Sequence, residues 1–512
     1  MLSERTYDVV VIGAGNGGLA AAATTAQKGM KTLLIEQHTL PGGYASSFVR
    51  GRFEFEPSLH ELCDVGKEGE WGACGTLFKD LGLDIEWVPV PEAYRMVITD
   101  KDEKLDVTMP FGLKEYIDKM EEYVPGSRKS VTNFFDLSQE VLEAIGYLGA
   151  SKGNPDKKVL TSKYSNFLKT ASYSVDQVEK ALKIPKKACD ILNAYWCYLG
   201  TDTGKLGFTI YAAMMIKFLL LGAYIPKMRS HEISLAFEKA IRDFGGDVIY
   251  GTKVEKILVE NGSVVGITTD KGEKINTKHV ICNAPRHVAF GSMVEGADEI
   301  KEKANREFNA RKVGGKGYVA YFGLNKTAKE LGITDYSYFI YPTADNKKLY
   351  SSMFERGKNP MQAIVCLNNA IPDCSPPGTS MLTVTTLYKD GAWDDVNETN
   401  YVQAKNKIAK DIVKNIESAL NIKISDAIEE FSVASPETFA RYACAYDGSI
   451  YGYESETWDS LLPRLLMMKD DLYINGLRFA GGFAFRCHGY SSGYMSGNTI
   501  GLLTYKDSLE DK

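Results

Sequence analysis

The N-terminal stretch combines short apolar runs with a longer helical pattern. The β-branched run Asp8–Ile12 predicts a buried parallel strand, and Lys31–Ile35 predicts a second one. Between them, the alanine-rich stretch Leu19–Lys28 predicts a helix. Strand, helix and strand in this order are typical of a βαβ unit, so the chain is expected to begin with an α/β fold built on a parallel sheet.

The turn between the first strand and the helix is rich in glycine. Gly13, Gly15 and Gly18 fit the pattern G-x-G-x-x-G. In this setting the glycines allow a tight turn, the approach of a pyrophosphate and close helix packing, and the helix N-terminus offers N–H groups to phosphates. Glu36 ends the second strand, where a carboxylate can accept hydrogen bonds from an unphosphorylated adenosine ribose. The segment therefore predicts FAD or NAD, rather than NADP.

Two apolar segments further along the chain bear on the class of protein. Leu206–Tyr224 is long enough for a membrane-spanning helix, but Lys217 lies inside it. We favour a buried or amphipathic helix, with membrane contact as the alternative.

In Arg311–Leu324 the glycines precede a strand instead of following one, so no second nucleotide-binding unit is predicted. NAD(P)H is then expected to have no site of its own, and a transient donor or acceptor would exchange any electrons.

Short apolar runs follow the predicted helix Ser234–Arg242 and are separated by N-G and K-G turns. Short strands with such turns predict a β-meander packed on the first domain. The runs are Asp247–Tyr250, Val254–Val259, Ser263–Thr268 and Lys278–Asn283.

The composition is that of an ordinary globular protein with an excess of aromatic residues. The 512 residues carry a formal net charge of −6 and are 44% hydrophobic. This excludes a disordered chain and argues against a general nucleic-acid binder, which would show a basic excess. The 29 Tyr and 22 Phe either pack a large core or line an apolar cavity.

The cysteines and the N-terminus predict a cytoplasmic protein. The nine cysteines show no C-x-x-C spacing, which favours reduced thiols over disulfides or a metal site. Cys487 is considered as a redox thiol and disfavoured, because no partner cysteine is near it in the sequence. From Met1 the chain enters the first strand without a secretory signal. Peripheral contact with a membrane is the alternative.

The segment after Glu36 carries a family resemblance. The stretches IGAGNGGLAAA, LLIEQHTLPGG and the F-x-F-E-P-S-L-H pattern ending at His60 resemble the FAD-dependent superfamily of phytoene desaturases, carotenoid isomerases and retinol saturases. The stretch from Ser435 to Gly452 is similar to the T-P-x-T-x-x-R-Y…G-x-x-Y-G pattern of the isomerase and saturase branch. The resemblance implies FAD as the cofactor, with Val254 near the adenine and Asn283 near the dinucleotide.

The resemblance also implies that a C-terminal strand, a glycine pair and a helix entrance close on the flavin. A helix N-terminus at that place would stabilise an anionic reduced flavin. The family often carries Asp, Glu or Gln after the first glycine of the pair, whereas this chain has Gly482. The predicted cofactor-binding residues are Gly13, Gly15, Asn16, Gly18, Glu36, Gln37, Gly42, Gly43, Ser46, Ser47, Val254, Asn283, Gly481, Gly482, Tyr494, Met495 and Ser496.

The predicted fold class is α/β, with a discontinuous Rossmann-like FAD-binding domain and an α+β substrate domain built from two insertions. The FAD-binding domain is expected to comprise residues 1–95, 228–300 and 465–512. The substrate domain is expected to comprise residues 96–227 and 301–464.

Catalysis needs a group that places or removes a proton beside the carbon that exchanges a hydride with the flavin. The leading candidates are His60, His488, Tyr490 and Arg441, and a wider set adds Glu61, His231, Glu232 and Tyr494. His60 stands where the retinol-saturase-like pattern also carries histidine. No metal is predicted.

The predicted function is FAD-dependent oxidoreduction of a carbon–carbon double bond in a large apolar substrate, such as a carotenoid, a retinoid, another isoprenoid or an unsaturated lipid. Saturation is favoured, and redox-neutral isomerisation with reduced FAD is close behind it. An amine-oxidase-like flavoprotein and a non-catalytic flavin-bearing lipid carrier remain as alternatives. Some aromatic residues are expected to line a long apolar cavity, namely those of Tyr195–Tyr224, Tyr318–Phe322 and Tyr442–Tyr453.

Overall fold

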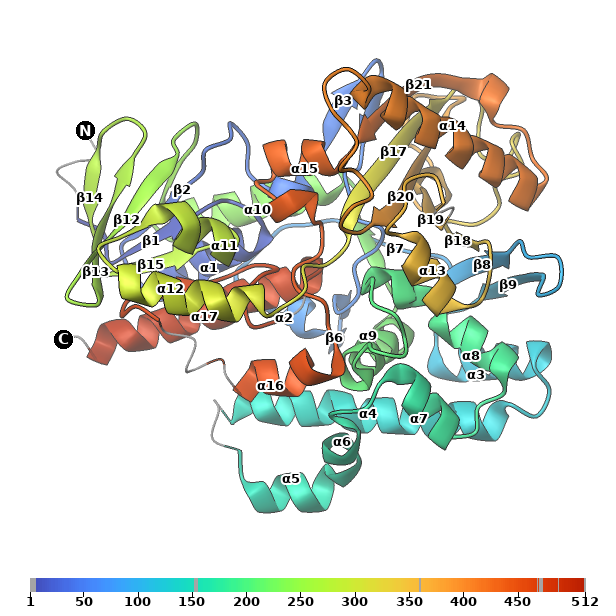
Figure 1. Cartoon of the computed structure of the whole chain (residues 1–512), viewed down its shortest axis with the longest axis horizontal. Coiled ribbons are helices and arrows are strands. Elements are labelled where there is room, and N and C mark those ends of the chain that lie inside the picture. The colour runs from blue at the N-terminus through green and yellow to red at the C-terminus, as the bar shows by residue number, and fades with distance from the viewer. Residues whose placement is uncertain are drawn as a thin grey trace.

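The computed structural model describes residues 6–151, 155–358, 361–466, 468, 473–486 and 488–510. Figure 1 shows two parts side by side, one with a parallel sheet and both chain ends, the other with a larger sheet and a group of helices. The predicted fold class, a Rossmann-like α/β part with an α+β part, is confirmed. The predicted domain boundaries stay a prediction.

The parallel sheet has the strand order β11-β2-β1-β15-β22, and every neighbouring pair in it runs parallel. Its three inner strands, β2, β1 and β15, are buried along their whole length, as strands of a sheet covered on both faces are. The strands of the whole sheet come from three separate stretches of the chain. Their bounds are β1 Val9–Ile12, β2 Thr32–Ile35, β11 Asp247–Ile249, β15 His279–Cys282 and β22 Leu477–Phe479.

Helices α1 (Asn16–Gln27) and α17 (Tyr490–Glu510) pack closely against each other beside this sheet. The approach depends on small residues, because a Cβ atom at Gly497 would lie 2.1 Å from the carbonyl oxygen of Gly17. Gly501 lies one turn further along the same face, next to Thr24. This packing fixes the N-terminus of α17 near the glycine turn that precedes α1.

The predicted β-meander is wrong for two of its four strands. The runs at Asp247–Ile249 and His279–Cys282 are β11 and β15, which belong to the parallel sheet. The other two runs join two short strands in a separate four-stranded sheet, because the turns between them allow antiparallel pairing. That sheet has the order β14-β13-β12-β16, with bounds Lys274–Asn276, Ser263–Thr269, Val254–Glu260 and Val294–Glu295.

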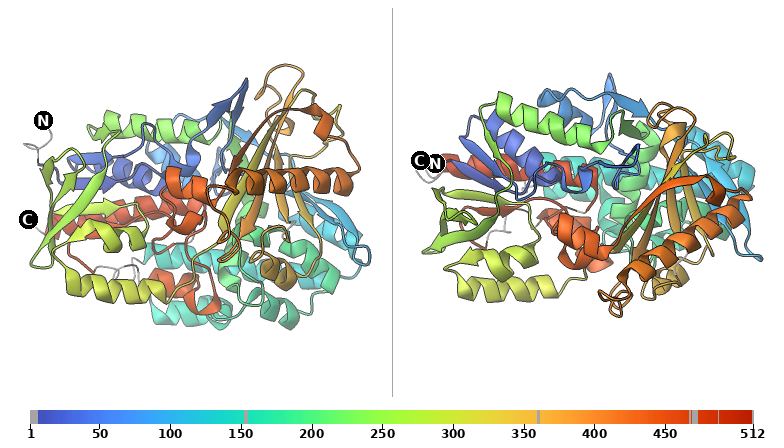
Figure 2. Two further views of the ribbon diagram at one scale, coloured as in Figure 1. Left: turned by 45° about the horizontal axis from the view of Figure 1, so that its top comes forward. Right: turned by 90° about the horizontal axis from the view of Figure 1, so that it is seen from above.

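The second part is built on a seven-stranded sheet of order β21-β17-β20-β19-β18-β8-β9. Its neighbours pair antiparallel except β18 and β8. Helix α14 (Tyr401–Leu420) covers one face (Figure 2), and Ile408, Ile412 and Ile416 pack there in one apolar cluster with the sheet. The strand bounds are β8 Tyr94–Ile98, β9 Leu105–Met109, β17 Lys316–Leu324, β18 Ser337–Tyr341, β19 Gln362–Cys366, β20 Ser380–Tyr388 and β21 Ile428–Ala434.

A group of helices lies below this sheet in Figure 1. The apolar window around Lys217 forms α9 (Phe208–Leu221), which is largely buried, and the Lys217 ammonium pairs with the buried Asp64 carboxylate at 2.6 Å. No helix within the described ranges is long and apolar enough to cross a membrane. The other helices of the group are α3 Leu113–Tyr123, α4 Arg128–Ala150, α5 Lys157–Lys163, α6 Ser165–Thr170, α7 Val175–Ala181 and α8 Lys186–Leu192.

Shorter elements connect the two parts. The strands are β3 Phe48–Arg50, β4 Phe53–Phe55, β5 Gly66–Lys67, β6 Glu70–Trp71, β7 Trp87–Pro89 and β10 Tyr224–Pro226. The helices are α2 Ala73–Asp80, α10 Ser230–Asp243, α11 Arg286–Val288, α12 Asp298–Asn309, α13 Asn346–Ser352, α15 Pro436–Tyr442 and α16 Leu461–Leu466. Eight cysteines are free thiols, and Cys487 lies outside the described residues.

Candidate functional site

A cavity of about 1350 Å³ runs from the glycine turn before α1 to the seven-stranded sheet. Pockets for one drug-sized ligand measure about 300–1,000 Å³. The cavity is therefore large enough for a cofactor and a substrate together. Its lining comes from both parts of the molecule, which places any bound substrate between them.

The glycine turn brings two glycine segments and an asparagine together. Gly15 pairs with Gly42 in an isolated β-bridge, and the amide of Gly42 donates to the carbonyl oxygen of Ala14 at 2.7 Å. The Asn283 side chain lies against this turn, because a Cβ atom at Gly15 would be 2.8 Å from its Nδ2. A side chain at Gly15 would therefore clash with the Asn283 side chain. It would also occupy the part of the cavity beside the glycine turn.

Glu36 lies on this same edge of the cavity. Its carboxylate accepts hydrogen bonds from the amide of Ala14 at 2.6 Å and from the amide of His38 at 2.7 Å. These bonds hold the carboxylate beside the glycine turn. At the start of α1, Asn16 Oδ1 is buried and has no hydrogen-bond partner among the described residues, although its residue lines the cavity. A buried acceptor without a donor fits a ligand that brings one.

Most residues predicted to bind the cofactor line the cavity. Four of them do not line it. A Cβ atom at Gly18 would be 1.9 Å from the carbonyl oxygen of Gly13, so Gly18 serves close packing. Tyr494 is buried and stacks on Phe237 at 5.2 Å, while Met495 and Ser496 lie further along α17. Those that line the cavity are Gly13, Gly15, Asn16, Glu36, Gln37, Gly42, Gly43, Ser46, Ser47, Val254, Asn283, Gly481 and Gly482.

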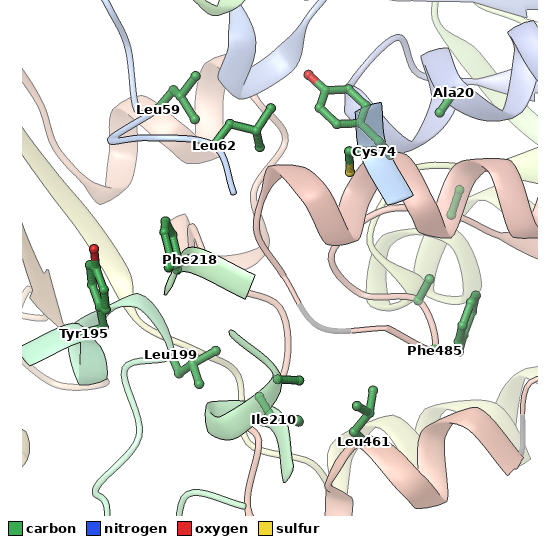
Figure 3. Packing of buried hydrophobic residues seen from close by; sticks show 14 of the residues in the cluster. Ala20, Leu59, Leu62, Cys74, Tyr195, Leu199, Ile210, Phe218, Leu461 and Phe485 are labelled. Atoms are coloured by element: carbon green, nitrogen blue, oxygen red, sulfur yellow. The ribbon is translucent and has the colours of Figure 1, made fainter. Parts of the chain in front are cut away.

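The loop of residues 57–63 crosses the cavity beyond the glycine turn, and all seven residues line it. Leu59 and Leu62 of this loop lie opposite Phe218 of α9 (Figure 3). The loop has three titratable side chains, His60, Glu61 and Cys63, and burial shifts the pKa of each away from its ordinary value.

Glu61 is a buried carboxyl group at the cavity. Burial raises its pKa to about 8, and hydrogen bonds from tyrosines oppose this rise only in part. One of these donors is the hydroxyl of Tyr198, 3.1 Å from Oε1. Oε2 is buried and has no hydrogen-bond partner within the described part of the chain. At neutral pH the group is therefore protonated and holds a proton that it can donate.

His60 and His488 are both neutral at physiological pH. Burial lowers the pKa of His60 to about 3, and its Nε2 lies 2.8 Å from the Ser337 hydroxyl. Burial also lowers the pKa of His488 to about 4. The Nε2 of His488 donates to the carbonyl oxygen of Tyr198 at 2.9 Å, and its ring stacks on Tyr451 at 4.2 Å. Both imidazole rings line the cavity, and neither carries the extra proton of the charged form at neutral pH.

The remaining two leading candidates differ in placement. The Tyr490 hydroxyl lies at the cavity and donates to the carbonyl oxygen of Tyr44 at 2.8 Å, and burial raises its pKa. Arg441 is exposed on α15 with its guanidinium over the Tyr442 ring, and it is not among the described residues that line the cavity. The structure therefore does not bring the candidate Arg441 to the cavity, because its side chain on α15 is exposed to solvent.

Glu61 belongs only to the wider set of candidates from the sequence, yet the structure places it buried in the lining of the cavity. The signal was present, because an acid beside His60 in an apolar loop is an uncommon combination. What the sequence did not contain was the position of Tyr198, which approaches from a segment far along the chain.

The aromatic residues divide between the cavity and the core. Tyr195, Tyr211 and Tyr318 are fully buried core residues that are not among the described residues lining the cavity. They pack on other rings, as Tyr195 does on Phe218 at 4.8 Å. Aromatic residues of the expected segments that do line the cavity are Tyr198, Phe218, Tyr321, Tyr442, Tyr446 and Tyr451.

A parallel sheet, a glycine turn and an acid that follows the second strand are typical of enzymes that bind a dinucleotide cofactor. The sequence profile of the flavin containing amine oxidoreductase family matches residues 192–497, and that of the FAD dependent oxidoreductases matches residues 8–64. The chain belongs to the flavin containing amine oxidoreductase family. It is an FAD-dependent oxidoreductase or isomerase, and its cofactor is FAD, as predicted.

Named relatives confirm the predicted superfamily. The chain is 25% identical over 474 residues to all-trans-retinol 13,14-reductase of Danio rerio, covering 87% of this chain and 77% of that protein. It is 22% identical over 465 residues to the chloroplastic prolycopene isomerase of Daucus carota, covering 88% and 72%.

Solved structures share the fold. An oxidoreductase from Methanosarcina mazei matches with a TM-score of 0.64 at 15% identity, covering 96% of this chain and 99% of that one. Putrescine oxidase bound to putrescine matches with a TM-score of 0.64 at 13% identity, covering 98% and 99%.

Proposed function

We propose that this protein acts on a carbon–carbon double bond of a large apolar isoprenoid, such as a retinoid or a carotenoid. The observation that carries the proposal is a buried carboxyl group, Glu61, in the lining of a cavity large enough for cofactor and substrate, where burial raises its pKa to about 8. The names of the relatives support it, since one is an all-trans-retinol 13,14-reductase and another a prolycopene isomerase.

The residues at the glycine turn fit FAD. We assign the phosphates to the backbone around Gly13 and Gly15, the adenosine ribose to Glu36 and the adenine to Val254, which all line the cavity. When bound, FAD supplies hydride acceptance or donation. The N-terminus of α17 lines the cavity at Tyr490 and Ser491, and a helix N-terminus favours negative charge placed before it.

Glu61 then supplies the proton. A general acid works best when its pKa lies near the operating pH, and burial places Glu61 there. Tyr198 orients the carboxyl group through Oε1, and the buried Oε2 has no hydrogen-bond partner among the described residues. His60 and His488 remain neutral and line the same cavity as Glu61. A transient donor is expected to supply electrons.

Saturation and isomerisation can use the same residues, and a mass measurement separates them. The dithionite-reduced holoenzyme is incubated without oxygen with all-trans-retinol or with prolycopene, and the products are analysed by mass spectrometry. A product heavier by two hydrogens supports saturation, which we favour, whereas an altered isomer of unchanged mass supports isomerisation. If neither compound changes and putrescine in air yields hydrogen peroxide, the proposal is overturned in favour of amine oxidation.

A further inference from the structure

One wall of the cavity is an apolar helix face that carries a single lysine. Helix α9 contributes Ile210, Ala213, Met214, Lys217 and Phe218 to the lining, and residues three or four positions apart share one face of a helix. Lys217 is the one charged residue in the sequence of α9, FTIYAAMMIKFLLL. An ammonium among apolar side chains costs free energy unless it is paired, so its place on the cavity wall calls for an explanation.

The side chains across from this face are apolar as well. Helices α4 and α16 pack against α9, and they contribute Ile145 and Leu461 to the lining. Figure 3 shows Leu461 close to Ile210 of α9. This part of the cavity therefore suits an apolar chain, with the ammonium as a polar point on its wall.

Asp64 holds the Lys217 ammonium in position. Its Oδ2 accepts a hydrogen bond from Nζ at 2.6 Å, while its Oδ1 accepts one from the amide of Ala73 at 3.1 Å. Asp64 itself is not among the described residues that line the cavity. Burial lowers the pKa of the Lys217 ammonium, but the Asp64 carboxylate raises it further, so the pKa lies above its ordinary value. The ammonium is charged at neutral pH, and the bond to Asp64 uses one of its three donors.

Arg486 brings a second positive charge to the lining. It lies in the loop that follows β22. Its guanidinium opposes the effect of Asp64 on the pKa of Lys217, as a neighbouring positive charge does. The acidic groups beside them in the lining are uncharged at neutral pH, because burial raises the pKa of Glu61 to about 8 and that of Cys63 to about 12.

We propose that Lys217 and Arg486 bind the carboxylate head of the substrate, which is then an apolar isoprenoid acid. A carboxylate accepts strong hydrogen bonds from both an ammonium and a guanidinium. A diphosphate would bring several charges to two cations, one of which is already paired with Asp64, and uncompensated charge at an apolar wall is costly. This inference rests on the proposed function and adds the head group of the substrate.

The head group would bind on the side of the cavity where the proton is supplied. Asp64 follows Glu61 by three residues, so their Cα atoms are at most about 11 Å apart. A carboxylate held by Lys217 therefore places the acid end of the chain, and the double bonds next to it, toward Glu61.

The test compares acids with the matching alcohols, which have the same chain and no charge. The ligands are all-trans-retinoate with all-trans-retinol and oleate with oleyl alcohol, and their affinities for the FAD-loaded enzyme are measured by quenching of tryptophan fluorescence. The native enzyme should bind retinoate about tenfold or more tightly than retinol, because a hydrogen bond to a charged group contributes that much.

Two double variants separate the head-group site from the effect of losing a buried ion pair. Lys217→Met combined with Asp64→Asn should abolish the preference for the acid and change retinol affinity less than about twofold. The control combines Lys389→Met with Glu454→Gln, an equally buried pair that is not among the described residues lining the cavity, and should keep the native preference. If the first double variant fails to fold, Lys217→Gln can still donate to Asp64 and should also reduce the preference for the acid.

The outcomes separate the head-group site from the proposed function. Equal native affinity for retinoate and retinol, or a preference that survives in the Lys217 variants, overturns the head-group site and leaves the proposed function standing. Loss of FAD, or equal weakening of acid and alcohol, also overturns it, because Lys217 would then serve the cofactor or the cavity wall. Binding of oleate but of neither retinoid, with the same dependence on Lys217, supports the head-group site and overturns the isoprenoid class. If the native enzyme binds none of the four ligands, both proposals fail.

Discussion

Replacing Glu61 by glutamine is the most direct test of the catalytic proposal. The amide keeps the size of the side chain and can still accept the hydrogen bond from the Tyr198 hydroxyl. It removes the one acidic proton that the carboxyl group holds at the cavity at neutral pH, where burial raises its pKa to about 8.

The expected loss follows from the contribution of a positioned acid. General acid–base catalysis is worth about 10²–10⁴-fold, so turnover of Glu61→Gln should fall by that factor. The pH profile should change as well. Native turnover should stay level below about pH 8 and fall above it, as the carboxyl group ionises. The variant should show no such decline.

Glu179 offers a matched control. It is also buried, burial raises its pKa to about 8, and it is not among the described residues that line the cavity. Glu179→Gln should therefore keep native turnover and the native pH profile. Both carboxyl groups have a folded pKa above the unfolded value of 4.5, so each favours folding most below pH 4.5 and loses this contribution as the pH rises toward 8.

Turnover is measured anaerobically with reduced holoenzyme and all-trans-retinol, and unfolding is followed in denaturant across the same pH range. In both variants the free energy of unfolding should lose a pH dependence of up to about 1.4 kcal/mol per pH unit. Native-like turnover in Glu61→Gln, with its loss of pH-dependent stability confirmed, would refute the assignment of Glu61 as the acid.

Three further variants test the geometry. Tyr198→Phe removes a hydrogen bond that lowers the pKa of Glu61, so the decline in turnover should move to higher pH. A decline that still begins at about pH 8 would contradict the hydrogen bond between Tyr198 and Glu61. Gly15→Ala places a Cβ atom 2.8 Å from Asn283 Nδ2 and should weaken FAD binding about tenfold or more. FAD retention is measured by flavin absorbance after gel filtration. The control Gly146→Ala, which has open space around its Cβ position, should retain FAD fully. Gly497→Ala forces α1 and α17 apart and should lower the free energy of unfolding by about 1–3 kcal/mol. If Gly497→Ala and Gly146→Ala are equally stable, the two helices tolerate the added methyl group and the prediction fails.

The local parts of the cofactor site were predictable because each depends on neighbouring residues. A β-branched strand, three glycines and an acid at the end of the next strand fix the turn before α1, and the structure places Gly15 and Glu36 at one edge of the cavity. Strand membership was less predictable. Asp247–Ile249 and His279–Cys282 have the same short apolar pattern as their neighbours, and only long-range pairing with β1 and β2 distinguishes them.

The choice of Glu61 as the proposed proton donor could not be made from sequence for the same reason. Charge state depends on burial, and the burial of Glu61 is produced by segments far along the chain, among them Tyr198 and Phe218. His60 was the more obvious candidate, because histidine titrates near neutral pH in water. The same burial that raises the pKa of Glu61 lowers that of His60 to about 3 and so exchanges their expected roles.

The arrangement around Tyr198 explains how one site can hold a single transferable proton. Its hydroxyl donates to Glu61, and its carbonyl oxygen accepts from His488, so one residue fixes both groups. Desolvation penalises the charged form of each, which leaves the carboxyl group protonated and the imidazoles neutral. Environments that push pKa values apart in this way assign the acid.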